Sequence, residues 1–214
     1  MMIVSAQINP DIALNIFWLV LAVLIWGVIH SLTASLEAKD WTRNILGDLR
    51  IRFYRFVYNV FSVISFIPIL WLMVILPDQV LYQIPAPWLY LSLTGQFAAL
   101  VLLVVGVLHT DTLSFVGLRQ LIEREERPST LVTHGFYRWV RHPLYTAGLL
   151  LIWLTPVMSQ NSLIVFITAT VYIIVGAHFE ERKLEREFGK AYAEYKGTTP
   201  MLIPGLHFGR NKKP

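Results

Sequence analysis

Two stretches of the chain carry titratable side chains at spacings suited to a binding site. The first, RHPLYTAG at residues 141–148, places Arg141 and His142 directly before a proline and an apolar run. A proline restricts the residue before it and suits the first turn of a helix, so we expect His142 at a helix N-terminus with Pro143 inside the helix. Tyr145 lies three residues further and faces the same side. The free N–H groups there would favour an anion such as a carboxylate. An interfacial belt of Arg, Trp and Tyr is the alternative.

The second stretch, HFEERKLEREFGKAYAEYK at residues 178–196, has the spacing of an amphipathic helix. Its apolar stripe consists of Leu184, Phe188, Tyr192 and Tyr195. Extending this stripe back by three residues reaches Glu181, so Glu181 is predicted on the packed face and Glu180 on the solvated one. Because burying an unpaired charge is costly, Glu181 needs a partner, for which Arg141, His142, His178 or a cationic ligand are candidates. The alternative is a juxtamembrane helix with ordinary charge pairs.

The composition indicates that these stretches belong to a membrane protein. Of the 214 residues, 55% are hydrophobic and only 15% are charged, whereas soluble domains have about a quarter charged. The chain has no cysteine, which excludes disulfides, thiolate metal sites and a cysteine nucleophile, and no metal site is predicted. No Lys or Arg precedes the first apolar run, so we expect no cleavable signal peptide.

Apolar segments of about 20 residues, long enough to span the hydrocarbon as helices, position the two stretches. Three such segments cover residues 12–32, 56–76 and 88–109. A fourth apolar stretch, residues 143–177, is too long for one helix, and Pro156 with the turn residues after it divides this stretch into two spans. The predicted fold is an all-α integral membrane protein with five transmembrane helices. The last two form a tight helical hairpin, and a cytoplasmic C-terminal amphipathic helix follows them.

The basic residues predict the orientation of these spans. All 18 Lys and Arg residues lie in the loops 33–55 and 110–142 or in the tail after residue 178. With five spans they all fall on one side, which the positive-inside rule assigns to the cytoplasm. We therefore expect the N-terminus outside, the C-terminus and the site on the cytoplasmic side, and a bacterial inner membrane. Topology and membrane lipids account for the net charge of +4, so nucleic acid is excluded as a partner.

Together the two stretches resemble the isoprenylcysteine carboxyl methyltransferase superfamily, which also includes phospholipid N-methyltransferases. The resemblance covers about residues 100–205 and rests on Gly135, Tyr137, Arg141, His142, Pro143, Tyr145, Glu180, Glu181, Leu184, Phe188, Gly189, Tyr192, Tyr195, Pro200, Ile203 and Pro204. It implies a multi-span fold that binds S-adenosylmethionine in a pocket closed by the C-terminal helix. It also implies that the cofactor contacts His142, Pro143, Tyr145, Glu180 and Glu181. The family pattern does not choose between the two glutamates, and the stripe favours Glu181.

Methyl transfer from a sulfonium depends mainly on positioning and desolvation. Aromatic faces such as Tyr145, Tyr192 or Trp139 would suit the soft cation, and Tyr137 is a further candidate for cofactor contact. The candidate catalytic residues are Arg141 and Glu181, although Arg141 by itself is the most anchor-like residue of its stretch. A carboxylate acceptor needs no general base, whereas a thiol or protonated amine must lose a proton to His142 or a glutamate. The chain has no G-x-G sequence, so the glycine-rich loop of soluble Rossmann-type methyltransferases is absent.

The first part of the chain has a different resemblance. Residues 30–62 resemble the NnrU-type membrane proteins, a group similar to the haem-containing ζ-carotene isomerases. His30, His109 and His178 are all predicted near inner span ends, where paired imidazoles could ligate haem or iron. The alternative is that they are hydrogen-bonded interfacial histidines. The predicted organisation is one membrane domain over residues 1–214. It consists of an NnrU-like three-span front half (1–109), a methyltransferase-like half (110–205) and a basic tail (206–214).

Three functions are therefore compared. The leading hypothesis is an S-adenosylmethionine-dependent methyltransferase acting on a small or lipophilic thiol, carboxylate or amine that arrives from the inner leaflet. Methyltransferases with an NnrU-like front half include ones that act on small thiols. The chain also has fewer spans than the eukaryotic carboxyl methyltransferases, which argues against a prenyl-cysteine acceptor. The alternatives are a haem-binding isomerase or redox protein and a non-enzymatic membrane scaffold. The predicted helix from Glu180 to Tyr195 favours the methyltransferase over the haem isomerase, because the function of a haem isomerase does not explain this helix.

Overall fold

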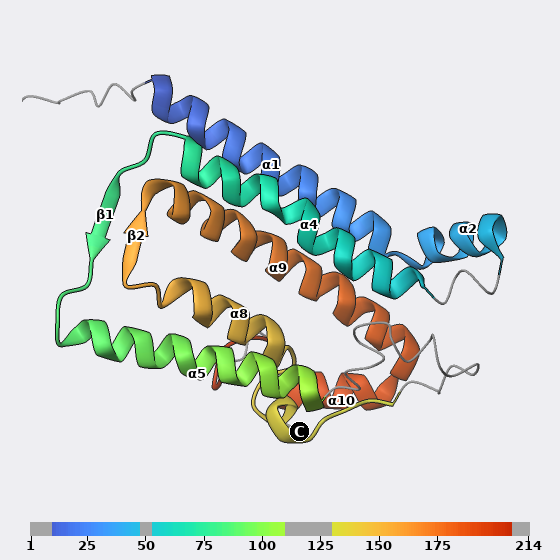
Figure 1. The fold of residues 1–214 in the computed structure, drawn as a ribbon. Coiled ribbons are helices and arrows are strands. Elements are labelled where there is room, and N and C mark those ends of the chain that lie inside the picture. The colour runs from blue at the N-terminus through green and yellow to red at the C-terminus, as the bar shows by residue number, and fades with distance from the viewer. Residues whose placement is uncertain (1–9, 48–52, 110–129, 207–214) are drawn as a thin grey trace, which may run out of the picture. The chain divides into compact units, whose positions relative to one another are not determined.

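The computed structural model describes residues 10–47, 53–109 and 130–206, most of which are helical (Figure 1). Within these residues four helices are long and apolar enough to cross a membrane: α1 (Pro10–Ala34), α4 (Tyr54–Ile75), α5 (Trp88–His109) and α9 (Gln160–Phe188). Helix α8 (Pro143–Trp153) is also apolar but has only 11 residues. The protein is thus a helical, multi-pass integral membrane protein, as the sequence predicted.

Shorter elements complete the fold. They are the helices α2 (Leu36–Leu46) and α10 (Lys190–Thr198), the 3₁₀ helix η1 (Gly135–Arg138), and the strands β1 (Val80–Gln83) and β2 (Val157–Ser159). The chain divides into two compact units. The first contains residues 1–84 and 157–169, and the second contains residues 85–156 and 170–214.

The first unit is built around α1, α4 and the beginning of α9. Leu19, Val23, Ile69 and Val165 form its buried apolar core. At the end of α4, the fully buried Asn161 donates from Nδ2 to the main-chain carbonyls of Met73, Leu76 and Pro77 at 3.2–3.4 Å. The last carbonyls of a helix have no partner within it, so this single amide stabilises the point where α4 ends.

A small antiparallel sheet in the first unit departs from the sequence prediction. Strand β1 pairs with β2, with Val80 opposite Ser159 and Gln83 opposite Val157. The sequence predicted only a turn around residues 156–162. A turn leaves backbone groups without partners, and the loop after α4 supplies those partners in extended conformation. This long-range pairing has no signature in the local pattern of residues 157–159.

Helix α9 also differs from the prediction, which ended the last span near residue 177 and began a separate helix at residue 178. No breaker lies between these segments, so α9 continues through Phe188 as one helix of 29 residues. It ends at Gly189, whose φ of +54° favours glycine, and α10 follows. The predicted amphipathic helix is therefore the last part of α9 together with α10.

In the second unit α5 packs closely against α8, and two glycines of α5 permit the approach. A Cβ on Gly106 would lie 2.7 Å from Leu144, and one on Gly95 would lie 2.8 Å from Leu154. The Gln96 amide donates to the Leu151 carbonyl at 2.8 Å. Helix α8 begins as predicted, with His142 as N-cap and Pro143 in its first turn.

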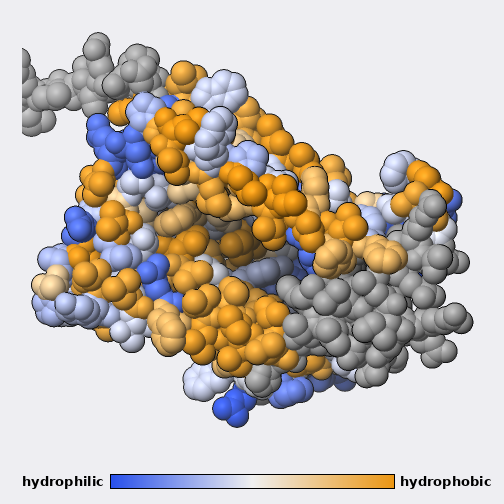
Figure 2. All heavy atoms as spheres, in the orientation of Figure 1, coloured by the Kyte–Doolittle hydropathy of each residue, from blue (hydrophilic) through white to orange (hydrophobic). Residues whose placement is uncertain are grey.

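Hydrophobic side chains cover much of the visible surface of the long helices (Figure 2). Val74 of α4 is 82% exposed and Phe97 of α5 is 68% exposed. In a soluble protein such contiguous apolar surface marks an interaction site. On helices of this length, lipid is its natural environment.

Candidate functional site: a cavity at the start of α8

The chain after α10 is hydrogen-bonded to the start of α8. The Arg141 and His142 amides donate to the Pro200 and Met201 carbonyls at 2.9 and 3.1 Å, and the Thr146 hydroxyl donates to the Leu202 carbonyl at 2.7 Å. These bonds hold α10 beside the Arg-His-Pro segment, although the two are more than 40 residues apart in sequence.

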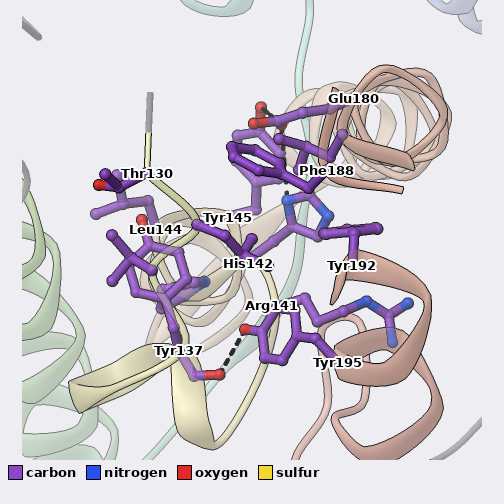
Figure 3. A pocket seen from close by; sticks show the side chains of 14 residues that line it. Thr130, Tyr137, Arg141, His142, Leu144, Tyr145, Glu180, Phe188, Tyr192 and Tyr195 are labelled. Carbon is purple, nitrogen blue, oxygen red and sulfur yellow. Dashed lines mark hydrogen bonds and ion pairs between the residues drawn. The ribbon is translucent and has the colours of Figure 1, made fainter. Parts of the chain in front are cut away.

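Between these elements lies a cavity of about 410 Å³ (Figure 3), a volume within the range of small-molecule sites. Its walls come from the chain before η1, from η1, from the first turn of α8 and from the facing sides of α9 and α10. The lining residues are Thr130, Leu131, Val132, Tyr137, Arg141, His142, Pro143, Leu144, Tyr145, Glu180, Leu184, Phe188, Tyr192 and Tyr195. Every predicted site residue except Glu181 is among them.

Glu181 is the buried glutamate, as the stripe predicted, with only 3% of its side chain exposed. Its Oε1 accepts from Arg141 Nε at 2.7 Å and lies 2.6 Å from Nη2. Its Oε2 lies 3.2 Å from Lys196 Nζ, which in turn lies 2.8 Å from Glu185. Arg141, one of the predicted candidates, is thus the cationic partner, and the cluster joins the segment before α8 to α9 and α10. Since two cations face two carboxylates, its charges balance.

Arg141 has a second set of contacts, at the end of α10. Its Nη1 donates to the main-chain carbonyls of Lys196, at 3.1 Å, and Thr199. A cation there satisfies carbonyls that lack helical partners and complements the helix dipole. Only 8% of the Arg141 side chain is exposed, so Arg141 holds the C-terminal segment in place. The interfacial-anchor alternative for this residue is wrong.

Glu180 has a different environment, and it lines the cavity. Its Oε2 accepts from the Tyr145 hydroxyl at 2.8 Å and lies 3.6 Å from His142 Nδ1. The rings of His142 and Tyr145 are stacked, with centroids 5.2 Å apart. Within the described ranges no Lys or Arg lies within ion-pair distance of Glu180. Among the described residues, His142 is thus the group nearest to its negative charge that can carry a positive one.

Two buried polar atoms of the cavity have no hydrogen-bond partner among the described residues. They are the hydroxyl of Tyr192, which is 1% exposed, and Nε2 of His142, which is 6% exposed. Nε2 lies 3.4 Å from Glu181 Oε1, but the geometry is not that of a hydrogen bond. Leaving such groups unsatisfied is costly, so each requires an explanation. A polar ligand in the cavity would satisfy both.

Three tyrosines of the cavity, Tyr137, Tyr192 and Tyr195, have a raised pKa. Burial raises the pKa of Tyr195 to about 12, and its hydroxyl donates to the Tyr137 carbonyl at 2.6 Å. Burial also raises the pKa of Tyr192 and, together with the nearby Glu180 carboxylate, that of Tyr137. The pKa of Lys196 is raised by its hydrogen bond to Glu185. The site therefore presents neutral aromatic faces at physiological pH.

Sequence reasoning missed part of the lining. Thr130, Leu131 and Val132 precede η1 and belong to no motif, and Leu144 reads only as the start of an apolar span. By contrast Trp139, considered for the aromatic wall, is 61% exposed and lies under the Arg138 guanidinium. No periodic pattern indicates the four missed lining residues, because three of them lie outside regular helices and Leu144 lies in the first turn of α8.

Two of the three histidines considered for haem, His30 and His178, have hydrogen-bond partners in their own unit. His30 lies in the first unit, where its ring nitrogens contact the hydroxyls of Tyr58 and Ser62 at 2.7 and 3.0 Å. His178 Nδ1 contacts the Ile174 carbonyl at 2.7 Å, and the side chain of His109 lies outside the described part. The arrangement of His30 and His178 is that of hydrogen-bonded histidines.

Fold and site thus define a multi-pass membrane protein with a ligand-sized cavity at one end of its helices. The chain belongs to the NnrU family, whose model matches residues 18–206. It is 31% identical over 189 residues to methanethiol S-methyltransferase 1 of Bradyrhizobium diazoefficiens, covering 86% of this chain and 65% of the relative. It is also 31% identical over 192 residues to the methanethiol S-methyltransferase of Crocosphaera subtropica, covering 84% and 71%.

A shorter match links the chain to the second family. The protein-S-isoprenylcysteine O-methyltransferase of Dictyostelium discoideum is 35% identical over 91 residues, which cover 41% of this chain and 38% of the relative. No solved structure gives a significant match. The resemblances to the isoprenylcysteine methyltransferases and to the NnrU proteins are both confirmed. The chain spans less than two thirds of the Bradyrhizobium relative's length.

Proposed function

We propose that this protein is a membrane methyltransferase that uses S-adenosylmethionine. The observation that carries the proposal is that, among the described residues, His142 Nε2 and the Tyr192 hydroxyl are buried without a hydrogen-bond partner, in a cavity that the Glu180 carboxylate also lines. A ligand with polar groups and a positive charge suits this combination. The relatives named as methyltransferases support the same conclusion.

The residues present fit this cofactor, which when bound supplies an electrophilic methyl group on a sulfonium. His142, Tyr192 and Glu180 would bind its polar groups. The aromatic faces of Tyr145 and Tyr137 would stabilise its positive charge.

Pro143 lines the same wall and would pack against the cofactor. We assign Arg141 and Glu181 to positioning, because their ion pair holds the cavity walls together. On sequence alone both residues are candidates for catalysis.

For the acceptor we propose a small thiol, on the strength of the two relatives named methanethiol S-methyltransferase. The walls formed by Leu131, Val132 and Leu184 suit a small apolar acceptor. A thiol must lose its proton for its sulfur to attack. The Glu180 carboxylate, 46% exposed, would take this proton and release it to solvent. A carboxylate or amine acceptor is the alternative.

We further propose five membrane crossings, with the N-terminus outside and the C-terminus in the cytoplasm of a bacterium. The pairing of β1 with β2 supports this, because it puts the connection before α9 on the same side as the loop after α4. Helix α8 spans about 16 Å at 1.5 Å per residue, and residues 154–159 add up to about 20 Å when extended. Together these lengths are sufficient to cross the hydrocarbon, which supports the proposal that α8 and α9 form the hairpin. The organisation as one domain, with parts 1–109, 110–205 and 206–214, stays a prediction.

The proposal is tested by calorimetry with S-adenosylhomocysteine on the protein in lipid nanodiscs. We expect binding that weakens at least about fivefold in Tyr192→Phe, because one buried hydrogen bond is worth about 1 kcal/mol, and more when its partner is charged. The matched control is Tyr90→Phe, which changes a tyrosine of α5 that is 65% exposed.

Absence of binding, or equal binding by both variants and by His142→Ala, would overturn the proposal. A Soret band in the purified protein would favour the haem alternative instead.

A further inference from the structure

Helix α2 begins directly after a membrane-spanning helix but is separate from it. Only Ser35 lies between α1 and α2, and its hydroxyl caps α2 by accepting from the Ala38 amide at 3.1 Å. The side chain of an N-cap replaces the missing helical partner, so Ser35 starts a new helix. Figure 1 shows α2 turned away from the axis of α1.

The residues of α2 are segregated on two faces. At 100° per residue, Ala38, Trp41 and Ile45 fall within one sector of about 60°. The charged residues Lys39, Asp40 and Arg43 lie on the other side of the helix, and Glu37 and Asn44 lie at the border between the two faces. Trp41 is 68% exposed and Ile45 is 59% exposed, so the described protein does not bury the apolar face.

The ends of α1 and α4 fix the level of α2 relative to the membrane. The Tyr54 hydroxyl, at the start of α4, donates to the Thr33 carbonyl, near the end of α1, at 2.6 Å. Both helices are apolar spans, and their exposed apolar surface continues to these ends, where Leu32 is 63% and Val57 is 59% exposed. With 11 residues, α2 is about 16 Å long. It therefore stays near the membrane surface at which α1 ends and α4 begins.

We propose that α2 lies in the interfacial layer of the bilayer, with Trp41 and Ile45 in contact with lipid. Its apolar face continues the lipid-facing surface of the adjoining spans, and tryptophan favours this depth. The two acidic and two basic residues of α2 cancel in charge. Insertion therefore rests on apolar burial and does not need anionic lipid. The contact holds whichever reaction the cavity performs.

Spin labels test this contact in the full chain, which has no cysteine of its own. Single substitutions Trp41→Cys and Ile45→Cys label the apolar face, and each leaves the other apolar residue intact. Asp40→Cys and Arg43→Cys are the matched controls on the polar face, and Val74→Cys is the lipid reference. Each label's accessibility to oxygen and to a water-soluble nickel complex is measured in nanodiscs of phosphatidylcholine, with and without phosphatidylglycerol.

We expect the oxygen-to-nickel accessibility ratio at positions 41 and 45 to approach that at 74 and to exceed the ratio at 40 and 43 severalfold in both lipids. Equal nickel accessibility at all four positions of α2 would overturn the proposal. Labels at 41 and 45 shielded from both reagents would also overturn it, in favour of a protein partner. A high ratio only with phosphatidylglycerol would refute insertion by apolar burial.

Discussion

Replacing Glu181 with glutamine separates the role of this residue from that of its neighbour. The Glu181 carboxylate contacts Arg141 at 2.6–2.7 Å and Lys196 at 3.2 Å and is almost fully buried. Removing one partner of a buried ion pair costs about 3–5 kcal/mol, because the other charge is left uncompensated. Glutamine still offers Arg141 an acceptor, and Glu185 still faces Lys196. We therefore expect Glu181→Gln to lower the free energy of unfolding by about 3 kcal/mol, the low end of this range. This loss changes the unfolding equilibrium constant by more than a hundredfold.

The matched control is Glu180→Gln, the same chemical change at the next residue. The Glu180 side chain is 46% exposed, and within the described part it has no Lys or Arg in ion-pair contact. Losing its charge should change the free energy of unfolding by no more than about 1 kcal/mol. The affinity for S-adenosylhomocysteine should change in the opposite order. We expect it to fall in Glu180→Gln, because Glu180 lines the cavity. The folded fraction of Glu181→Gln should retain more of this affinity.

The unfolding free energies are measured by titrating the detergent-solubilised variants with sodium dodecyl sulfate and following helical circular dichroism. Affinities are measured by calorimetry under conditions in which each variant is folded. Two variants with equal unfolding midpoints would refute the structural role of the Glu181 cluster. An affinity lost in Glu181→Gln and unchanged in Glu180→Gln would refute the assignment of the two glutamates.

Three further predictions concern the walls and the packing. Gly106→Ala places a Cβ 2.7 Å from Leu144, which must shift, so S-adenosylhomocysteine should bind severalfold more weakly in calorimetry. The control Gly148→Ala has nothing within 4 Å and should bind normally, with about 0.5–1 kcal/mol of added stability. The pKa of Tyr195 is raised to about 12 from 10.0. Its stabilising contribution is therefore complete below pH 10 and is lost as the pH rises toward 12. An unfolding series against pH should show a smaller alkaline loss in Tyr195→Phe, and an unchanged loss would contradict this. Asn161→Ala removes the donor to three carbonyls at the end of α4. It should lower the free energy of unfolding by about 1–3 kcal/mol with unchanged ligand affinity.

Much of the site could be predicted because its chemistry is local. A proline after His142 indicates a helix start whatever the rest of the chain does, and a stripe of apolar residues identifies Glu181 as buried. Hydropathy likewise identified the long helices, because a helix that crosses lipid must be mostly apolar along its whole length. These features depend only on neighbours in sequence.

The missed features depend on distant residues. The stripe shows that Glu181 is buried but not what it faces, and its ion pairs with Arg141 and Lys196 turn it away from the cavity lining. Arg141 resembled an anchor because its partners are 40 or more residues away in the sequence. Strand β2 exists only because the loop after α4 pairs with it.

The central claim, that the cavity supports methyl transfer, is tested most directly with S-adenosylmethionine whose transferable methyl group carries an isotope label. The purified protein in lipid nanodiscs is incubated with this donor and methanethiol, and the volatile product is analysed by mass spectrometry. We predict labelled dimethyl sulfide from the unmodified protein and a strongly reduced amount from Tyr192→Phe and Glu180→Gln. Labelled product formed equally by all three proteins, or no transfer to any thiol, carboxylate or amine acceptor despite a folded protein, would contradict the account.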